Sequence, residues 1–251
     1  MAGSDSAPQG GCGACGEDAP DFHLRMAFQP IVDLSSGGVF AYEALVRGPE
    51  GQSAGDVLAG VAPDDLYAFD QQCRVAAIRQ AVEAGIVDTG AVLSINFLPN
   101  AVYSPLACIQ LTLKTARAVD FPTDRLLFEF TETQKMDAEH VGRIVEAYRN
   151  LGFRTALDDF GAGHSGLGLL ARFVPDFIKI DMELVRGIDG SKPRQIIVNE
   201  IARMGEALGA TIIAEGIETQ EELDTLRYLG IRYVQGYLLA RPEIGRLPMA
   251  G

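Results

Sequence analysis

The sequence predicts an α/β protein, namely a modified TIM (β/α)8 barrel with an antiparallel first strand. The first observation is that eight extended apolar segments alternate with helical ones from Leu24 onward, which is the order typical of such barrels. The second is that the segments 24–32 and 39–46 are separated by only six residues. So short a connection cannot contain a crossover helix, and the two segments should therefore form a hairpin. An open doubly wound sheet is the alternative, but no Gly-x-Gly-x-x-Gly turn follows an early strand.

The individual elements follow in order along the chain. The strands are expected at 24–32, 39–46, 92–97, 126–130, 154–157, 177–180, 211–214 and 233–238. The helical stretches between most of them include 65–84, 138–151, 193–208 and 220–229. The segments 53–58 and 68–84 carry no motif, and we assign them roles in packing only.

Two regions differ in composition. Residues 1–20 are poor in aromatic and β-branched residues and should form a disordered N-terminal tail, which contains Cys12 and Cys15. Residues 21–251 contain no Pro/Gly-rich linker and should form one domain.

The charge of the chain limits its partners. Among 251 residues, 34 acidic against 21 basic ones give a formal net charge of −13. This excess of acid argues against duplex nucleic-acid binding, which needs a basic surface. No apolar run reaches the roughly 18 residues of a membrane helix, and the first residues lack the basic and apolar regions of a secretory signal. We therefore expect a cytoplasmic protein without membrane contact.

The adjacent acids Asp158 and Asp159 are the most informative residues of the chain. They follow an apolar run and precede Phe160 and Gly161, where a turn is expected. Successive strand residues point to opposite faces, so both acids can serve one site only where the strand ends. Two adjacent carboxylates repel each other unless a proton or a cation neutralises them. The pair alone fits a solvated loop, but acids at other strand ends favour a metal site.

Polar side chains recur at the C-terminal ends of the predicted strands, where the chemistry of such barrels collects. They are Glu43, Arg47, Asn96, Glu129, Glu132, Asp158, Asp159, Lys179, Asp181, Glu215, Glu218 and Gln235. Carboxylate and amide oxygens are the ligands of hard cations such as Mg²⁺ or Mn²⁺. No His or Cys cluster with zinc-ligand spacing competes. The set suggests attack of water on a phosphate ester, assisted by two ions about 3.5–4 Å apart.

These residues belong to eight motifs whose order resembles that of the EAL-domain cyclic di-GMP phosphodiesterases, from about Leu24 to the end of the chain. The motifs are Phe28-Gln29-Pro30-Ile31, Glu43-Ala44-Leu45 with Arg47, Asn96, Glu129-Phe130-Thr131-Glu132, Asp158-Asp159-Phe160-Gly161, Lys179-Ile180-Asp181, Glu215-Gly216-Ile217-Glu218-Thr219 and Gln235-Gly236-Tyr237. One tripeptide alone would mean little, whereas eight motifs in the right order are specific.

The resemblance implies hydrolysis of one phosphodiester of cyclic di-GMP to linear 5′-pGpG, with two Mg²⁺ or Mn²⁺ ions per site. By analogy, one ion is held by Glu43, Asn96, Glu129 and Asp158. Asp158 would also bridge to the second ion, whose site Asp159 completes.

The remaining roles implied by the resemblance concern catalysis and substrate. Glu43, Lys179 and Glu215 are the catalytic residues, and the last two position or activate the attacking water. Gln29, Arg47 and Gln235 bind the substrate, and Arg47 is suited to a phosphate group. Glu132 and Glu218 support the ligands without binding the ions, and Glu132 is associated with anchoring the loop after the fifth strand.

That loop departs from the usual pattern of the family. Residues 161–166 read Gly-Ala-Gly-His-Ser-Gly, where the family commonly has Thr at 162, an aromatic residue at 164 and Ser at 166. Loss of a hydroxyl and gain of glycine should alter the ordering of the loop. In the family this region often contributes to dimerisation, so we expect a homodimer. We also expect control by a regulatory protein partner, by oligomerisation, by the tail or by the substrate level.

Two functions without catalysis stand as alternatives: a silent receptor for cyclic di-GMP, and an interaction module that no longer binds the nucleotide. Such relatives typically have a changed residue at the position of Glu43, the Asp158-Asp159 pair or Lys179. All of these residues are intact here, which favours the enzyme.

Overall fold

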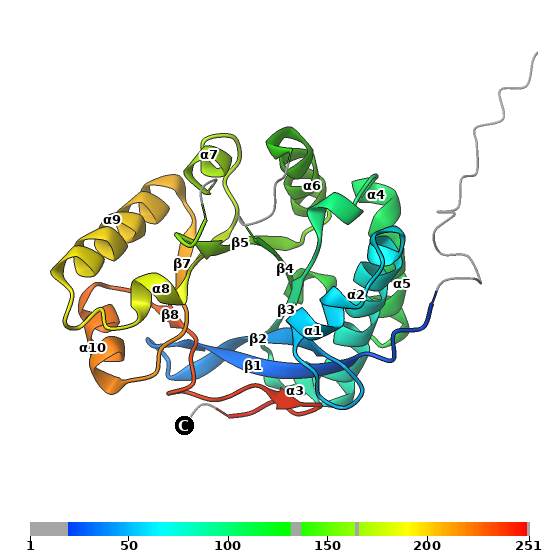
Figure 1. Cartoon of the computed structure of the whole chain (residues 1–251), viewed down its shortest axis with the longest axis horizontal. Helices are drawn as coiled ribbons and strands as arrows, with labels where there is room; N and C mark the ends of the chain where they lie inside the picture. Colours follow the sequence, from blue (N-terminus) through cyan, green and yellow to red (C-terminus); the bar gives the residue numbers. More distant parts are fainter. Residues whose placement is uncertain (1–19, 132–136, 164–165, 250–251) are drawn as a thin grey trace, which may run out of the picture.

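The hairpin predicted at the start of the chain is present. In the computed structural model, which describes residues 20–131, 137–163 and 166–249, β1 (Arg25–Asp33) pairs antiparallel with β2 (Gly38–Arg47). The strands that follow are all parallel to β2 as far as β8. The order β2-β3-β4-β5-β6-β7-β8-β1 closes because β1 pairs with both β8 and β2 (Figure 1). The expected barrel with an antiparallel first strand is therefore confirmed.

The remaining strands are close to their predicted positions. They are β3 (Val92–Asn96), β4 (Leu126–Thr131), β5 (Arg154–Phe160), β6 (Phe177–Ile180), β7 (Thr211–Ala214) and β8 (Tyr233–Val234). β5 is three residues longer than predicted, and β8 is four residues shorter, so Gln235 and Gly236 follow the strand instead of belonging to it.

The helices lie outside the ring of strands (Figure 1). The longer ones are α2 (Leu66–Glu83), α5 (Gln110–Ala118), α6 (Ala138–Asn150), α9 (Lys192–Leu208) and α10 (Gln220–Tyr228). The shorter ones are α1 (Ala54–Ala59), α3 (Ile86–Thr89), α4 (Pro105–Cys108), α7 (Gly166–Leu170) and α8 (Met182–Val185), with 3-10 turns at Pro63–Asp65, Pro99–Ala101 and Thr123–Arg125. In the part of the chain that the structure describes, no helix is long and apolar enough to cross a bilayer.

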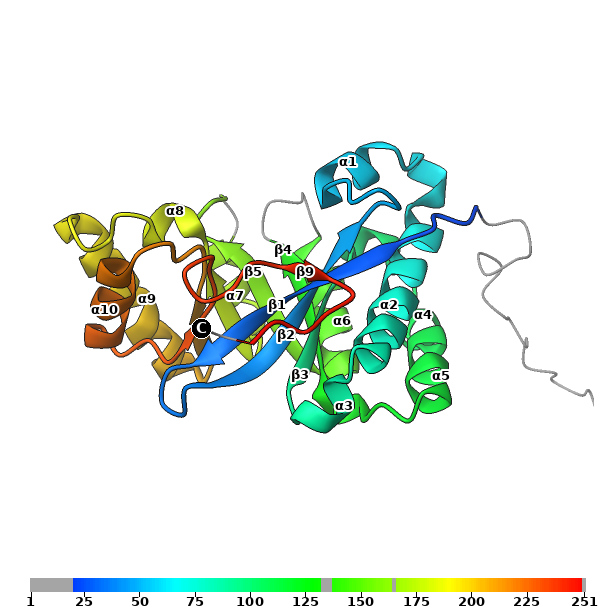
Figure 2. The same cartoon turned by 90° about the horizontal axis from the view of Figure 1, so that it is seen from below.

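The C-terminal segment lies against the hairpin (Figure 2). Its short strand β9 (Glu243–Ile244), which was not predicted, pairs antiparallel with β1 at Ala27 and Phe28. The Tyr42 hydroxyl of β2 donates a hydrogen bond to the Pro248 carbonyl. The segment thus lies along β1, which is joined to β2 by a short turn instead of a helix.

The barrel interior contains an apolar layer toward the N-terminal ends of the parallel strands. It consists of Ile31, Ala41, Val92, Leu127, Ala156, Phe177 and Ile213, one residue from each of β1 to β7, with Tyr233 of β8 packed against them. Inward-facing residues recur every second position along a strand. The next inward position therefore lies one level closer to the C-terminal ends of the parallel strands, and it is polar in all eight cases, although in β7 and β8 it is the residue just after the strand.

Candidate metal centre

The polar layer contains most of the residues predicted from the strand ends. Moving two residues toward the C-terminal rim from the apolar layer gives Gln29, Glu43, Ser94, Glu129, Asp158, Lys179, Glu215 and Gln235. Because β1 is antiparallel, the step on that strand runs backwards, from Ile31 to Gln29. Alternation in the sequence thus brings eight polar side chains from distant segments to one level of the barrel.

A bulge in β5 turns Asp158 and Asp159 toward the same site. Leu157 pairs with Ile178 and Phe160 with Ile180, so three steps along β5 match two along β6. Asp159 takes up the extra residue with a φ of +54°, a conformation that non-glycine residues adopt rarely and often at functional sites. The strand therefore continues past the pair, and the bulge brings the two carboxylates to one site.

Lys179 lies at the centre of the layer with its ammonium group surrounded by carboxylates. Its Nζ is 2.7 Å from Glu129, 2.8 Å from Glu215, 3.1 Å from Asp158 and 3.5 Å from Glu43. The side chain is only 1% exposed, so these contacts are hardly screened by solvent.

Glu43 is held by two further donors, both of them side-chain amides. The Asn96 side-chain amide donates to Oε1 of Glu43 at 2.9 Å. Oε2 accepts from the Gln235 amide at 2.8 Å, and that amide also donates to Oε1 of Gln29 at 3.1 Å. The side-chain carbonyl oxygen of Gln235, Oε1, is buried and has no hydrogen-bond partner among the described residues, so it is available to a ligand.

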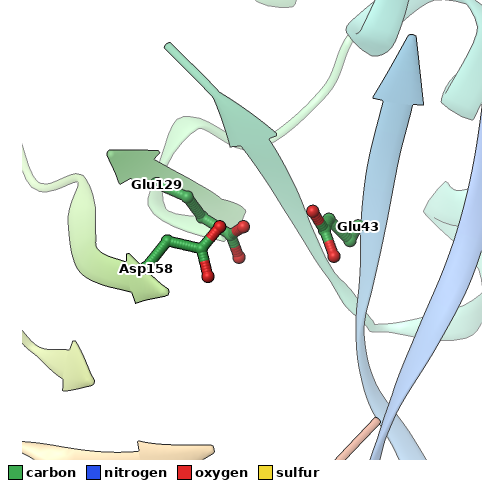
Figure 3. Close-up of side chains that lie close together, drawn as sticks. All are labelled: Glu43, Glu129 and Asp158. Atoms are coloured by element: carbon green, nitrogen blue, oxygen red, sulfur yellow. The ribbon is translucent and has the colours of Figure 1, made fainter. Parts of the chain in front are cut away.

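Two groups of carboxylates have the spacing of cation sites. Ligand atoms of Glu43, Glu129 and Asp158 lie within 4.8 Å of one another, and the same holds for Asp158, Asp159 and Glu215. Figure 3 shows Glu129 and Asp158 side by side, with Glu43 facing them from β2. Asp158 belongs to both groups, as the predicted bridging role requires, and Glu215 joins the second group in addition to its predicted catalytic role.

The charge balance of the layer favours cations. In the described residues, four carboxylates lie within ion-pair distance of the Lys179 ammonium group, and Asp159 adds a fifth carboxylate beside Asp158 and Glu215. Burial and the like charges of Glu43 and Asp158 raise the pKa of Glu129 to about 8. Burial and the charge of Asp158 raise the pKa of Asp159 to about 6. Burial also raises the pKa of Glu215 well above its ordinary value, despite its contact with Lys179. Oxygen donors with this surplus of negative charge fit Mg²⁺ or Mn²⁺.

The pKa values of Glu43 and Lys179 are shifted in the directions that keep both groups charged. Burial alone would raise the pKa of Glu43, but Lys179 and the amides of Gln235 and Asn96 outweigh it and lower that pKa. Burial would lower the pKa of Lys179, yet the surrounding carboxylates raise it well above its ordinary value.

Two pockets open beside Glu43. The larger, of about 450 Å³, is lined by Glu43, Asn96, Asp158 and Asp159 together with apolar side chains of α1, α2 and β3. The smaller, of about 150 Å³, lies on the side of β1 and β8 and is lined by Gln29, Glu43, Glu215 and Gln235, with Tyr237 at its edge. Glu43 thus lines both pockets, whereas Asp158 and Asp159 line only the larger and Glu215 only the smaller.

Two of the predicted residues, Arg47 and Glu218, lie outside this layer. Arg47 is half-buried, and its guanidinium donates to the carbonyl of Val46 instead of lining either pocket. Glu218 lines the smaller pocket, where it forms an ion pair with Arg186 at 2.5 Å. Glu132 lies outside the described residues, as do positions 164 and 165 of the unusual loop.

The structure also adds two residues to which the sequence analysis gave no role. Ser94 donates a hydrogen bond from Oγ to Oε1 of Glu129 at 2.5 Å. Its position two residues before Asn96 on one strand was a usable signal, because such residues share a face. Arg186 follows α8 and lines the smaller pocket, and no pattern in the sequence indicated it.

Comparison with known proteins gives a consistent family match. The family model described as "EAL domain" matches residues 19–242. BluF of Escherichia coli K12, a blue light- and temperature-regulated antirepressor, is 30% identical over 231 residues, which are 92% of this chain and 57% of BluF. The cyclic di-GMP phosphodiesterase PdeB of Shewanella oneidensis is 34% identical over 152 residues, or 60% of this chain and 18% of PdeB. The chain therefore spans only part of the length of these two relatives.

Solved structures match more completely. A standalone EAL protein from Vibrio cholerae O395, in its c-di-GMP-bound form, is 45% identical with a TM-score of 0.88, covering 92% of this chain and 97% of that one. The manganese and cyclic di-GMP complex of Klebsiella pneumoniae BlrP1 is 38% identical with a TM-score of 0.83, covering 90% of this chain and 57% of that one.

Proposed function

The chain belongs to the EAL domain family, and we propose that it is a phosphodiesterase that hydrolyses cyclic di-GMP to linear 5′-pGpG. The observation that carries this proposal is the polar layer. It contains two clusters of three carboxylates that have Asp158 in common, and Asp158 contacts Lys179. Relatives in this family include a cyclic di-GMP phosphodiesterase and structures with bound cyclic di-GMP and manganese.

The two pockets support a cyclic dinucleotide as the substrate. Such a molecule places its two nucleosides on either side of a central ring that contains the phosphates. Glu43 and Leu45 line both pockets, so a phosphate at the carboxylates would leave one nucleoside on each side. Arg47 at the end of β2 is the residue that we propose for a second phosphate contact, together with Gln29 and Gln235 in the smaller pocket.

The two clusters of carboxylates would each hold one divalent cation. We assign Glu43, Asn96, Glu129 and Asp158 to one ion, and Asp158, Asp159 and Glu215 to the other. Bound there, the ions would lower the pKa of a water molecule and offset the negative charge of the phosphate oxygens. Asn96 donates its amide to Glu43, so its carbonyl oxygen is the group that remains for a cation.

The residues of the chain provide for the proton transfers of the reaction. The oxygen of water bonds to phosphorus, the bond from phosphorus to one 3′-oxygen breaks, and that oxygen takes up a proton. We propose Glu215, which lines the smaller pocket beside Glu43, as the group that accepts the proton that the water loses. Lys179 contacts Glu215 at 2.8 Å, which fixes the orientation of the carboxylate and places a positive charge close to the developing negative charge.

The test is nucleotide chromatography of cyclic di-GMP incubated with the purified protein. We expect pGpG to accumulate with Mg²⁺ or Mn²⁺, and not with EDTA or with a Glu43→Gln variant. Binding of cyclic di-GMP without product would instead support the receptor function, and absence of both would support the interaction module. Light scattering in the same preparation tests the homodimer that we propose.

A further inference from the structure

A buried ion pair lies inside helix α2, outside the polar layer. Arg74 Nη2 is 2.5 Å from Asp70 Oδ2, and the two side chains are 0% and 2% exposed. Nη1 of Arg74 donates to the Tyr148 hydroxyl of α6 at 2.9 Å. The guanidinium also lies over the ring of Phe97, 5.3 Å from its centroid. Burial of two charges is costly, and well-packed apolar side chains often serve stability as well or better, so stability alone does not explain the pair.

The second oxygen of Asp70 connects the pair to the end of β3. Asp70 Oδ1 accepts a hydrogen bond from the Leu98 N–H at 2.8 Å. The preceding N–H, that of Phe97, donates to the Glu129 carbonyl of β4 at 2.9 Å. The chain just after Asn96 is therefore held from two sides, by a helix and by a neighbouring strand.

Asn96 is the residue whose placement depends on this connection. It is the last residue of β3, and its amide donates to Glu43 at 2.9 Å. Asp70, Asn96 and Glu43 all line the larger pocket. Because Leu98 is only two residues from Asn96, the tether at Leu98 limits how far the Asn96 side chain can move from the carboxylates.

We propose that Asp70 and Arg74 are positioning residues, which hold the end of β3 so that Asn96 presents its amide group to the metal centre. Arg74 holds the Asp70 carboxyl in place through their ion pair, and Tyr148 holds Arg74 in place. The inference depends on the proposed function, because it assumes that the polar layer binds divalent cations. Removal of a group that orients a metal ligand typically lowers the metal affinity by about 10–100-fold.

The experiment replaces the pair by apolar side chains of similar size, Asp70→Leu with Arg74→Met. Because the exchange removes both charges together, it leaves no unpaired charge in the interior. Mn²⁺ binding is measured without nucleotide, by the loss of the electron paramagnetic resonance signal of free Mn²⁺, and folding is followed by thermal melting. We expect a folded protein whose affinity for Mn²⁺ is lower by about 10-fold or more. Asp70→Asn combined with Arg74→Met keeps an acceptor for the Leu98 N–H, again without an unpaired charge, and should retain most of the wild-type affinity.

A matched control removes an ion pair at the other end of the barrel. Arg232 donates to both oxygens of Asp33, at 2.9 and 2.6 Å, where β1 ends beside β8. The variant with Asp33→Leu and Arg232→Met should melt at a lower temperature but bind Mn²⁺ as the wild type does.

Three results would contradict either the positioning role or the proposed function, and the measurements tell the two apart. A folded Asp70→Leu/Arg74→Met protein with wild-type affinity for Mn²⁺ would overturn the positioning role and leave the proposed function intact. No binding of Mn²⁺ by the wild type would overturn the proposed function itself. If the double variant does not fold, hydrogen exchange of the Leu98 amide in the wild type decides. Slow exchange without metal supports the tether, and exchange at the rate of an open loop overturns it.

Discussion

Replacing Lys179 by Met tests whether this side chain holds the carboxylates together. The variant removes the ammonium that lies within 3.5 Å of Glu43, Glu129, Asp158 and Glu215, and it keeps a long unbranched side chain in the core. Without cations, the layer would then contain only acidic groups and neutral amides, and some carboxyl groups would take up protons to limit the repulsion.

The magnitude follows from the burial of the group. Loss of one partner from a buried ion pair costs about 3–5 kcal/mol in the free energy of unfolding. Because protonation of the carboxyls offsets part of this loss, we expect a value of about 3 kcal/mol for the metal-free protein at pH 8. In a domain of this size, 1 kcal/mol shifts Tm by about 2–4 °C, so Tm should fall by about 6–12 °C.

Thermal melting in EDTA, followed by circular dichroism, measures this difference. Lys114→Met is the matched control, because Lys114 is an exposed lysine on α5. Saturating Mn²⁺ should bring the Tm of the Lys179→Met protein closer to that of the wild type, while cyclic di-GMP turnover should remain low. A metal-free Lys179→Met protein that melts within about 2 °C of the wild type at pH 8 would refute the central position of Lys179.

Three further predictions concern the shared ligand, the pH and a close backbone contact. Asp158→Asn should reduce turnover by at least about 100-fold with little change in Tm, because it removes the carboxylate common to both groups; near-normal turnover would contradict the bridging role. The metal-free wild type should lose stability from pH 5 to 8. Asp159 and Glu129, with pKa values of about 6 and 8, hold protons in the folded state that the unfolded chain has already released. A Tm that rises across this range in EDTA would contradict this prediction. Gly236→Ala should lower both Tm and turnover, because its Cβ would overlap the backbone of Ile217; assays of the purified variant that match the wild type would exclude this tight contact.

The barrel and most of its polar layer could be predicted because both follow from local patterns. The six-residue connection between the first two strands predicted the hairpin, and alternation along each strand determined which side chains point inward. The same rule applies to Ser94, which precedes Asn96 by two residues and contacts Glu129. Ser94 was given no role because a neutral serine hydroxyl is a less typical ligand of a divalent cation than a carboxylate.

Other features depend on contacts between distant segments. The bulge at Asp159 is a mismatch between β5 and β6, which neither strand shows alone. The tether from Asp70 to Leu98 joins α2 to the end of β3, and the residues of that helix were therefore predicted to have packing roles only. Arg186 is brought to the smaller pocket by the turn that follows α8, so its neighbours in sequence gave no indication of the site.

The most direct test of the account is hydrolysis of cyclic di-GMP in ¹⁸O-labelled water with Mn²⁺, followed by mass spectrometry of the product. If water attacks one phosphodiester at this site, each pGpG molecule should carry one ¹⁸O atom in its 5′-phosphate, and the Glu43→Gln variant should form no product. Unlabelled pGpG, or equal product from the Glu43→Gln variant, would contradict hydrolysis at the polar layer.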